Sequence, residues 1–93
     1  MATFNWNVSP GTRMVSNQFW VSKGQTIHVA ATASPSSSTF WIGIMDGLNN
    51  ARYVEGTGNL SHGFSITSSG HYRVFVQNRS SVQINAAGSY YFD

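Results

Sequence analysis

Aromatic and planar polar side chains are concentrated between residues 41 and 53. Aromatic rings stack on the apolar faces of sugars while amide, carboxylate and guanidinium groups bond the hydroxyls, an amphipathic chemistry common at interfaces. The set consists of Trp41, Asp46, Asn49, Asn50, Arg52 and Tyr53. Asp46-Gly47 is a strong turn signal, which predicts a loop after the strand that carries Trp41. The pattern indicates a glycan site beside this loop; alternatively, Trp41 packs against a neighbouring strand or another subunit.

A second polar and aromatic surface is predicted in the last third of the chain. If residues 71–77 and 82–86 form a hairpin, alternate side chains of its two strands share one face. Those side chains are His71, Arg73, Phe75, Gln77, Gln83 and Asn85. A flat, regular face suits another sheet better than a small ligand. Loops at sandwich ends are the usual place for recognition residues, so the loop 46–53 is the preferred site.

Acidic residues are too few for most catalytic arrangements. The chain contains Asp46, Glu55 and Asp93, and Asp93 is its last residue. Glycoside hydrolysis needs two carboxyl groups at a fixed separation, which leaves Asp46 with Glu55, and Asp46 already has a turn role. No Gly-x-Ser-x-Gly elbow accompanies the serines and histidines. The sequence therefore predicts a protein that is not an enzyme.

Metal-binding patterns are weak. His28, His62 and His71 form no HxH or HExxH unit, although His62 and His71 could meet across a hairpin. A calcium site in the segment 46–50 would have a single carboxylate. Cysteine is absent, which excludes disulfides, Cys-ligated zinc and thiol catalysis. No cofactor and no metal are expected.

The composition indicates one small domain with a nearly uncharged polar surface. The 93 residues allow a single domain spanning 1–93. Charged residues make up 9%, against roughly 25% in ordinary soluble domains. Ser, Thr, Asn and Gln together number 33. Such a surface without cysteines suits a secreted bacterial protein, with Met1 and Ala2 interpreted as a start added to a mature chain.

Charge and hydropathy argue against two kinds of partner. The net charge of +2 comes from few charges rather than a basic patch, whereas phosphate binding needs clustered Lys and Arg. Nucleic acid is therefore not expected as a partner. No apolar run approaches the roughly 18 residues of a membrane helix, so no transmembrane segment is expected either.

Apolar and polar residues alternate along most of the chain, and the helical spacing i, i+3, i+4, i+7 is absent. Strands are predicted at 4–8, 12–21, 26–33, 40–45, 52–55, 64–66, 71–77 and 82–92, with an exposed connection at 56–63 and a bulge at 87–88. The run 40–45 is apolar on both faces, which predicts a central strand, and 52–55 is predicted at an edge. The pattern favours an all-β fold, a single antiparallel Greek-key or jelly-roll-like sandwich of about eight short strands.

The same alternation predicts the side chains that face the core. They are Ile27, Val29, Phe40, Ile42, Ile44, Phe64, Ile66, Tyr72, Val74, Val76, Val82 and Ile84. Tyr72 is expected to keep its hydroxyl at the edge of this core, where the hydroxyl finds a hydrogen-bond partner.

The C-terminal third resembles the closing strands of small exported β-sandwich proteins of Gram-positive bacteria. Residues 64–92 have the sequence FSITSSGHYRVFVQNRSSVQINAAGSYYF. The shared pattern is Gly-x-Tyr-x-Val-x-Val-x-Asn-x-Ser-Ser, then a Val-rich strand, a glycine and an aromatic residue. It is similar to bacterial pre-peptidase C-terminal and Golgi-dynamics-like sandwiches, in which a Ser-Gly-x-Tyr turn precedes the penultimate strand. The resemblance implies a sandwich fold and transfers no catalytic residue.

Two classes of function fit these observations. The first is an exported, non-enzymatic, lectin-like binding protein for glycan or another cell-surface component. The alternative is an envelope-directed antimicrobial of the bacteriocin kind, or a self-assembling surface protein that forms homo-oligomers. Low charge, two-faced strands and the aromatic end 90–92 are typical of an assembling sheet.

Overall fold

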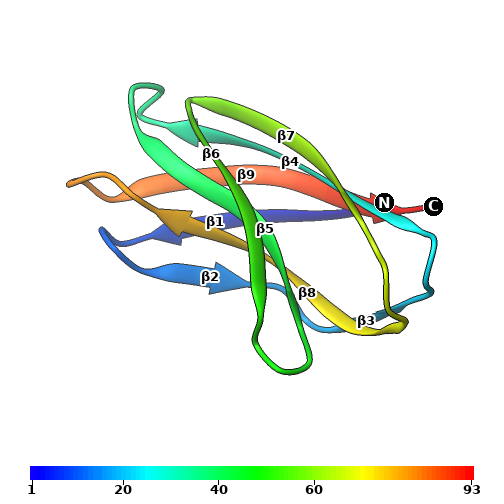
Figure 1. Cartoon of the computed structure of the whole chain (residues 1–93). Coiled ribbons are helices and arrows are strands. Elements are labelled where there is room, and N and C mark those ends of the chain that lie inside the picture. The colour runs from blue at the N-terminus through cyan, green and yellow to red at the C-terminus, as the bar shows by residue number, and fades with distance from the viewer.

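Two antiparallel sheets pack face to face in the computed structural model, which describes residues 1–93 (Figure 1). Sheet A contains, in spatial order, β1 (Ala2–Val8), β9 (Ile84–Phe92), β4 (Thr26–Ser34) and β7 (Asn59–Ser65). Sheet B contains β8 (Gly70–Asn78), β5 (Thr39–Asp46) and β6 (Ala51–Thr57), and β2 (Arg13–Val15) and β3 (Phe19–Val21) pair with the other side of β8. The predicted all-β sandwich is confirmed.

The strand order is that of a jelly roll. β2 and β3 pair with successive parts of β8 and act as one interrupted edge strand. Counted in this way, the eight strands pair first with last, second with seventh, third with sixth and fourth with fifth. This pairing is the winding of a jelly roll. Both chain ends lie at one end of the sandwich (Figure 1), since Ala2 pairs with Tyr90.

The single strand expected at 12–21 is broken at Ser16. The Ser16 backbone N–H donates to the Val74 carbonyl at 2.9 Å, and the Val74 N–H donates to the Ser16 hydroxyl at 3.0 Å. A side-chain oxygen therefore takes the place of a backbone carbonyl in the ladder. The chain leaves the sheet here and rejoins it at Phe19.

The core lies between the sheets and consists of alternate residues of their strands. Eleven of the twelve predicted core residues are buried. The Tyr72 hydroxyl donates to the Ser68 carbonyl at 2.6 Å, so its expected position at the core edge is confirmed. The apolar run 40–45 forms most of β5, which is central in sheet B, and β6 is an edge strand, both as predicted.

The prediction for Val82 is wrong, because this side chain is 49% exposed. The Val82 carbonyl accepts hydrogen bonds from the Asn78 side-chain amide at 2.7 Å and from the Ser80 hydroxyl at 3.0 Å. These bonds turn the backbone of Val82 inward, and its side chain faces solvent. β9 begins two residues later, at Ile84.

The expected hairpin of 71–77 with 82–86 does not form. β8 lies in sheet B between β5 and the β2–β3 edge, whereas β9 lies in sheet A between β1 and β4. The fully buried side chain of Asn78 directs the crossing. Its NH2 group donates to the Val8 carbonyl at 2.9 Å, and its Oδ1 accepts from the Ser80 N–H at 2.8 Å. The chain therefore passes from one sheet to the other after β8.

Two glycine-containing segments also differ from expectation. The connection predicted at 56–63 is mostly strand, because only Gly58, with φ of 75°, separates β6 from β7. The bulge predicted at 87–88 is absent, and the register with β1 runs through both positions. Gly88 is required by close packing instead, since a Cβ there would lie 2.7 Å from the Phe4 ring.

Candidate ligand-binding surface

The outer face of sheet B carries the largest group of aromatic and charged side chains. Strand alternation directs Trp41 of β5, Tyr53 of β6 and Phe75 of β8 away from the core. The outward residues of this face that carry an aromatic, charged, amide or thioether group are Arg13, Trp20, Trp41, Met45, Tyr53, Glu55, His71, Arg73, Phe75 and Gln77. The candidate surface is this set together with Arg79, whose guanidinium lies over Trp41.

Trp41 is packed within a stack of side chains. Its ring centroid lies 3.9 Å from that of Tyr53 at an interplanar angle of 18°, and the Arg79 guanidinium carbon lies 4.5 Å from it. The Arg79 backbone N–H donates to the Thr39 carbonyl, two residues before Trp41, and Tyr53 pairs with Gly43, two residues after it. Arg79 and Tyr53 therefore lie on either side of Trp41 along β5. The faces of the indole are therefore occupied, while Tyr53 remains 48% exposed.

Phe75 points outward but is fully buried. Its ring lies over Gly43, where a Cβ would be 2.6 Å from two ring carbons. The Arg13 guanidinium covers the ring at 4.0 Å and is fixed by the Gln77 side-chain oxygen at 2.6 and 2.9 Å. Its remaining contact is with the Met45 sulfur at 3.5 Å. The middle of the face is thus closed and rigid.

The loop between β5 and β6 is organised by the Asp46 carboxylate. It accepts hydrogen bonds from the backbone N–H groups of Asn50 and Leu48, both at 2.9 Å, and from the Asn50 side-chain amide at 3.1 Å. The backbone N–H of Asn50 contributes most to holding the pKa of Asp46 below its ordinary value. Asn49 has φ of 63°, a left-handed conformation that Asn tolerates. The loop has a defined shape before any ligand binds.

Two adjoining hollows flank this loop at the end of the sandwich. The smaller has a volume of about 160 Å³ and is lined by Ile44, Asp46, Asn50, Arg52, Thr67, Ser68 and Tyr72. The larger has a volume of about 360 Å³ and is lined by Gln18, Asp46, Gly47, Leu48, Ser68, Ser69, Gly70, His71 and Tyr72. Asp46, Ser68 and Tyr72 line both, so carboxylate, hydroxyl, guanidinium and imidazole groups meet in one region.

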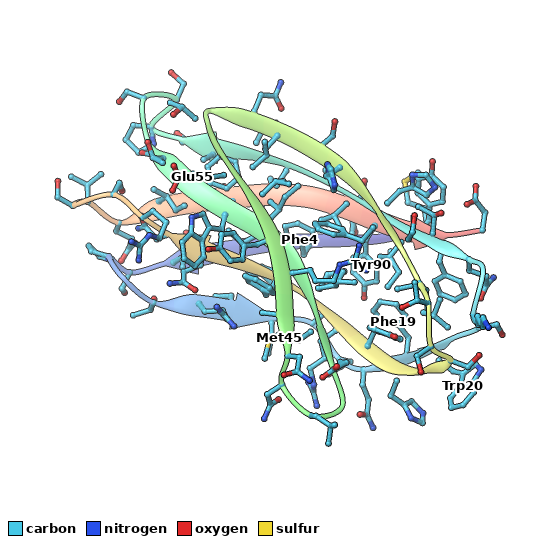
Figure 2. All side chains as sticks on the ribbon, in the orientation of Figure 1. Phe4, Phe19, Trp20, Met45, Glu55 and Tyr90 are labelled. Atoms are coloured by element: carbon cyan, nitrogen blue, oxygen red, sulfur yellow. The ribbon has the colours of Figure 1, made fainter.

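Trp20 is the most exposed aromatic side chain, at 54%, and contacts His71, which lines the larger hollow. Its indole meets the His71 ring edge-on, with centroids 5.2 Å apart and an interplanar angle of 81°. Figure 2 shows Trp20 projecting from β3 away from the body of the sandwich. An indole with exposed surface beside polar groups is the arrangement that stacking on a sugar requires.

The six residues singled out from the sequence occupy three places. Asp46, Asn50 and Arg52 line the smaller hollow, where Arg52 donates to the Ser65 carbonyl. Trp41 and Tyr53 lie on the outer face of sheet B, and Asn49 is in the exposed turn. Alternation separates them, because neighbouring strand residues such as 52 and 53 point to opposite faces. The same rule directs Trp20 outward, because it lies between the inward-facing Phe19 and Val21.

The remaining chemical candidates are far apart. Glu55 pairs with Trp41, and Asp46 is five residues further along β5, so the acids are roughly 17 Å apart at about 3.4 Å per residue. Glycosidase carboxyls are at most about 9.5 Å apart. His62 is in sheet A and His71 in sheet B, and no three His, Cys, Asp or Glu residues are grouped as metal ligands.

Comparison with known proteins adds no relative. Neither models of protein families nor curated protein sequences match this chain. The fold contains no helix of the length and apolarity needed to cross a bilayer.

Proposed function

We propose that this chain is an exported, non-enzymatic binding module for glycan. Its site is the candidate surface at the end where Trp20 and His71 meet the loop 46–53. The observation that carries the proposal is the exposed indole of Trp20 against His71, which lines a hollow together with Gln18 and Asp46. Glycan ligands need such a combination, since a sugar has apolar faces and hydroxyls around its rim.

The site supports weak binding. Its hollows have volumes of about 160 and 360 Å³, and Trp20 is the only tryptophan with more than half of its surface exposed. Hydrogen bonds contribute roughly 0.5–1.5 kcal/mol each, and aromatic stacking about as much. A few of these contacts together correspond to a Kd on the order of 1 mM, so a polymer that contacts several positions binds better than a monosaccharide.

The hydrogen bonds of the Asp46 and Glu55 carboxylates favour binding over catalysis. Asp46 is committed to its loop through three hydrogen bonds, and Glu55 accepts a hydrogen bond from the Trp41 indole N–H at 2.9 Å. Export is supported by a composition in which 9% of the residues are charged. The scarcity of clustered cations supports a partner other than nucleic acid.

A glycan array followed by titration of the best polysaccharide tests this function. We expect selective binding that falls about three- to ten-fold in Trp20→Ala. Tyr91→Ala is the matched control, because Tyr91 is 42% exposed and stacks on a histidine, but on the outer face of sheet A. Absence of any array signal, or equal losses in both variants, would contradict the proposal.

Self-assembly is the second candidate, and the edges of sheet A favour it. Edge strands usually carry charges or Pro that prevent pairing with other chains. β1 and β7 contain no Lys, Arg, Asp, Glu or Pro, whereas the edges of sheet B contain Arg13, Arg52 and Glu55. Light scattering over a concentration series would detect assembly, and a growth-inhibition plate would detect an antimicrobial activity without sugar binding.

A further inference from the structure

We infer that the glycan is acidic, a polysaccharide bearing carboxylate or sulfate groups that Arg13, Arg73 and Arg79 recognise. This inference rests on the proposed function and names the chemical class of its ligand. It starts from these three arginines of the candidate surface, all of which lie outside the loop 46–53.

None of these three guanidinium groups has a carboxylate partner. Arg13 is bonded to the side chains of Gln77 and Met45. Arg73 donates to the Ser16 carbonyl at 2.8 Å, and Arg79 lies over the Trp41 ring. Neutral partners orient a guanidinium without cancelling its charge, and each guanidinium has five N–H groups, some of which stay available for a ligand.

The net charge of the protein resides on this surface. Three arginines face one acid, Glu55, which gives +2, and Lys23 and Arg52 elsewhere balance Asp46 and Asp93. The Asp93 carboxylate is bonded to the His28 ring at 3.1 Å, on the sheet A side. The candidate surface therefore attracts anions over a Debye length of about 8–10 Å, and Asp46, beside His71, is the negative charge that opposes this at the loop end.

The aromatic side chains of the surface favour a polysaccharide over single-stranded nucleic acid. Arg73 and Arg79 are six residues apart, roughly 20 Å along the extended chain, and Arg13 lies between them opposite Gln77, so a ligand that meets all three is a polymer. Single-stranded nucleic acid needs free aromatic faces for its bases, and those of Trp41 are occupied.

A pair of polymers that differ only in charge tests the inference. We compare polygalacturonate with its fully methyl-esterified form, by titration at 20 mM and 500 mM NaCl. We expect the acid to bind at least ten-fold more tightly at low salt and to lose this advantage at high salt. Because Arg13 covers Phe75, its replacement risks unfolding, so Arg79→Gln is the principal variant, with an expected loss of about five-fold. Lys23→Gln removes the same charge outside the surface and should bind as the parent protein.

The outcomes separate the inference from the proposed function. Equal binding of both polymers, unchanged in Arg79→Gln, would overturn the acidic class and leave glycan binding standing. Binding to neither polymer nor any array glycan would overturn both. Equally tight binding of a single-stranded oligonucleotide or of phosphatidylglycerol vesicles would also overturn the inference, because the surface would then be selective for negative charge alone.

Discussion

The two outer faces of the sandwich are built by the same alternation but differ in chemistry. The face of sheet B has three arginines and partly exposed rings of Trp and Tyr. The face of sheet A has neither lysine nor arginine. Its outward residues are Thr3, Asn5, Asn7, Thr26, His28, Ala30, Thr32, Ser34, Asn59, Ser61, Gly63, Ser65, Asn85, Ala87, Ser89 and Tyr91.

The difference lies in how polar groups are satisfied. On sheet A, the Asn85 side-chain amide donates to the Asn5 side-chain oxygen at 2.6 Å. The Thr32 hydroxyl donates to the Asn59 side-chain oxygen at 2.9 Å. These groups bond one another. On sheet B, the arginines are oriented by neutral partners and keep their charge. The proposed glycan recognition therefore depends on guanidinium charge without a carboxylate partner and on exposed ring surface.

A hollow alone does not distinguish the faces. Sheet A has one of about 300 Å³, bordered by His28 and Tyr91. Those two rings are stacked on each other, with centroids 4.6 Å apart and an interplanar angle of 13°. Its other lining residues are mostly small, and it contains no uncompensated cation. We therefore expect any ligand to prefer the outer face of sheet B. Single substitutions test how far the two outer faces differ.

The largest effect is expected for Asn78→Ala, which removes the amide that joins β8 to β1. The Val8 carbonyl would lose its donor in a fully buried position, and the crossing to β9 would lose its bonds to Ser80 and Val82. Chemical denaturation should show a loss of about 3 kcal/mol. Asn85→Ala removes an amide from the outer face of sheet A and should cost less than about 1 kcal/mol. A comparable loss in both would mean that the network on sheet A is essential to the fold.

Gly43→Ala should have the next largest effect and acts on sheet B alone. The added Cβ would collide with the Arg52 carbonyl and lie 2.6 Å from the Phe75 ring, which fills the closed middle of the face. Overpacking of this kind costs about 1–3 kcal/mol. Gly47→Ala, with nothing within 4 Å of its added Cβ, is the control for denaturation. Unchanged stability in Gly43→Ala would show that the ring is not held as described.

Trp41→Ala is expected to have a smaller effect on stability, and it distinguishes the two tryptophans of sheet B. The indole packs between Arg79 and Tyr53, so its loss should lower stability by about 1 kcal/mol. Polysaccharide titration should show a smaller loss of affinity than Trp20→Ala, because the faces of Trp41 are already occupied. The reverse order of the two variants would move the site to the centre of the sheet.

Asp46→Asn should have the smallest effect, visible mainly with pH. The backbone N–H of Asn50 lowers the pKa of Asp46 below its ordinary value of 3.8, so folding favours the ionised carboxylate. Its stabilisation is complete above 3.8 and is lost as the pH falls through the lowered value. Amide exchange at Leu48 and Asn50 should therefore quicken on acidification in the parent protein. The variant should exchange faster already at neutral pH and lack this step, whereas Asp93→Asn should retain it.

Alternation in the sequence predicted which side chains are buried better than which strands are neighbours. The core residues of β4, β5 and β8 follow from their period of two. The crossing of the chain to the other sheet after β8 could not be predicted in this way. Alternation indicates which face of a sheet a side chain is on, but it does not indicate which strands are neighbours. That crossing depends on the long-range bond from Asn78 to Val8, seventy residues away.

The candidate site was predicted in part for the same reason. The loop 46–53 was located from Asp46-Gly47, and its acid and amide do lie beside a hollow. Trp20 and His71 join it only because β3 pairs with β8, which no local pattern indicates. The positive charge of sheet B likewise comes from two distant parts of the chain, β2 and β8 with Arg79 directly after it.

Mapping of amide and indole shifts in an NMR titration with hexagalacturonate tests the assignment of the binding face most directly. We predict shifts at the Trp20 indole and along His71, Arg73 and Gln77, extending to the loop 46–53. The amides of Asn5, Thr32 and Ser61 should stay unchanged and serve as an internal control on sheet A. Shifts confined to sheet A, with Trp20 and His71 silent, would contradict the assignment.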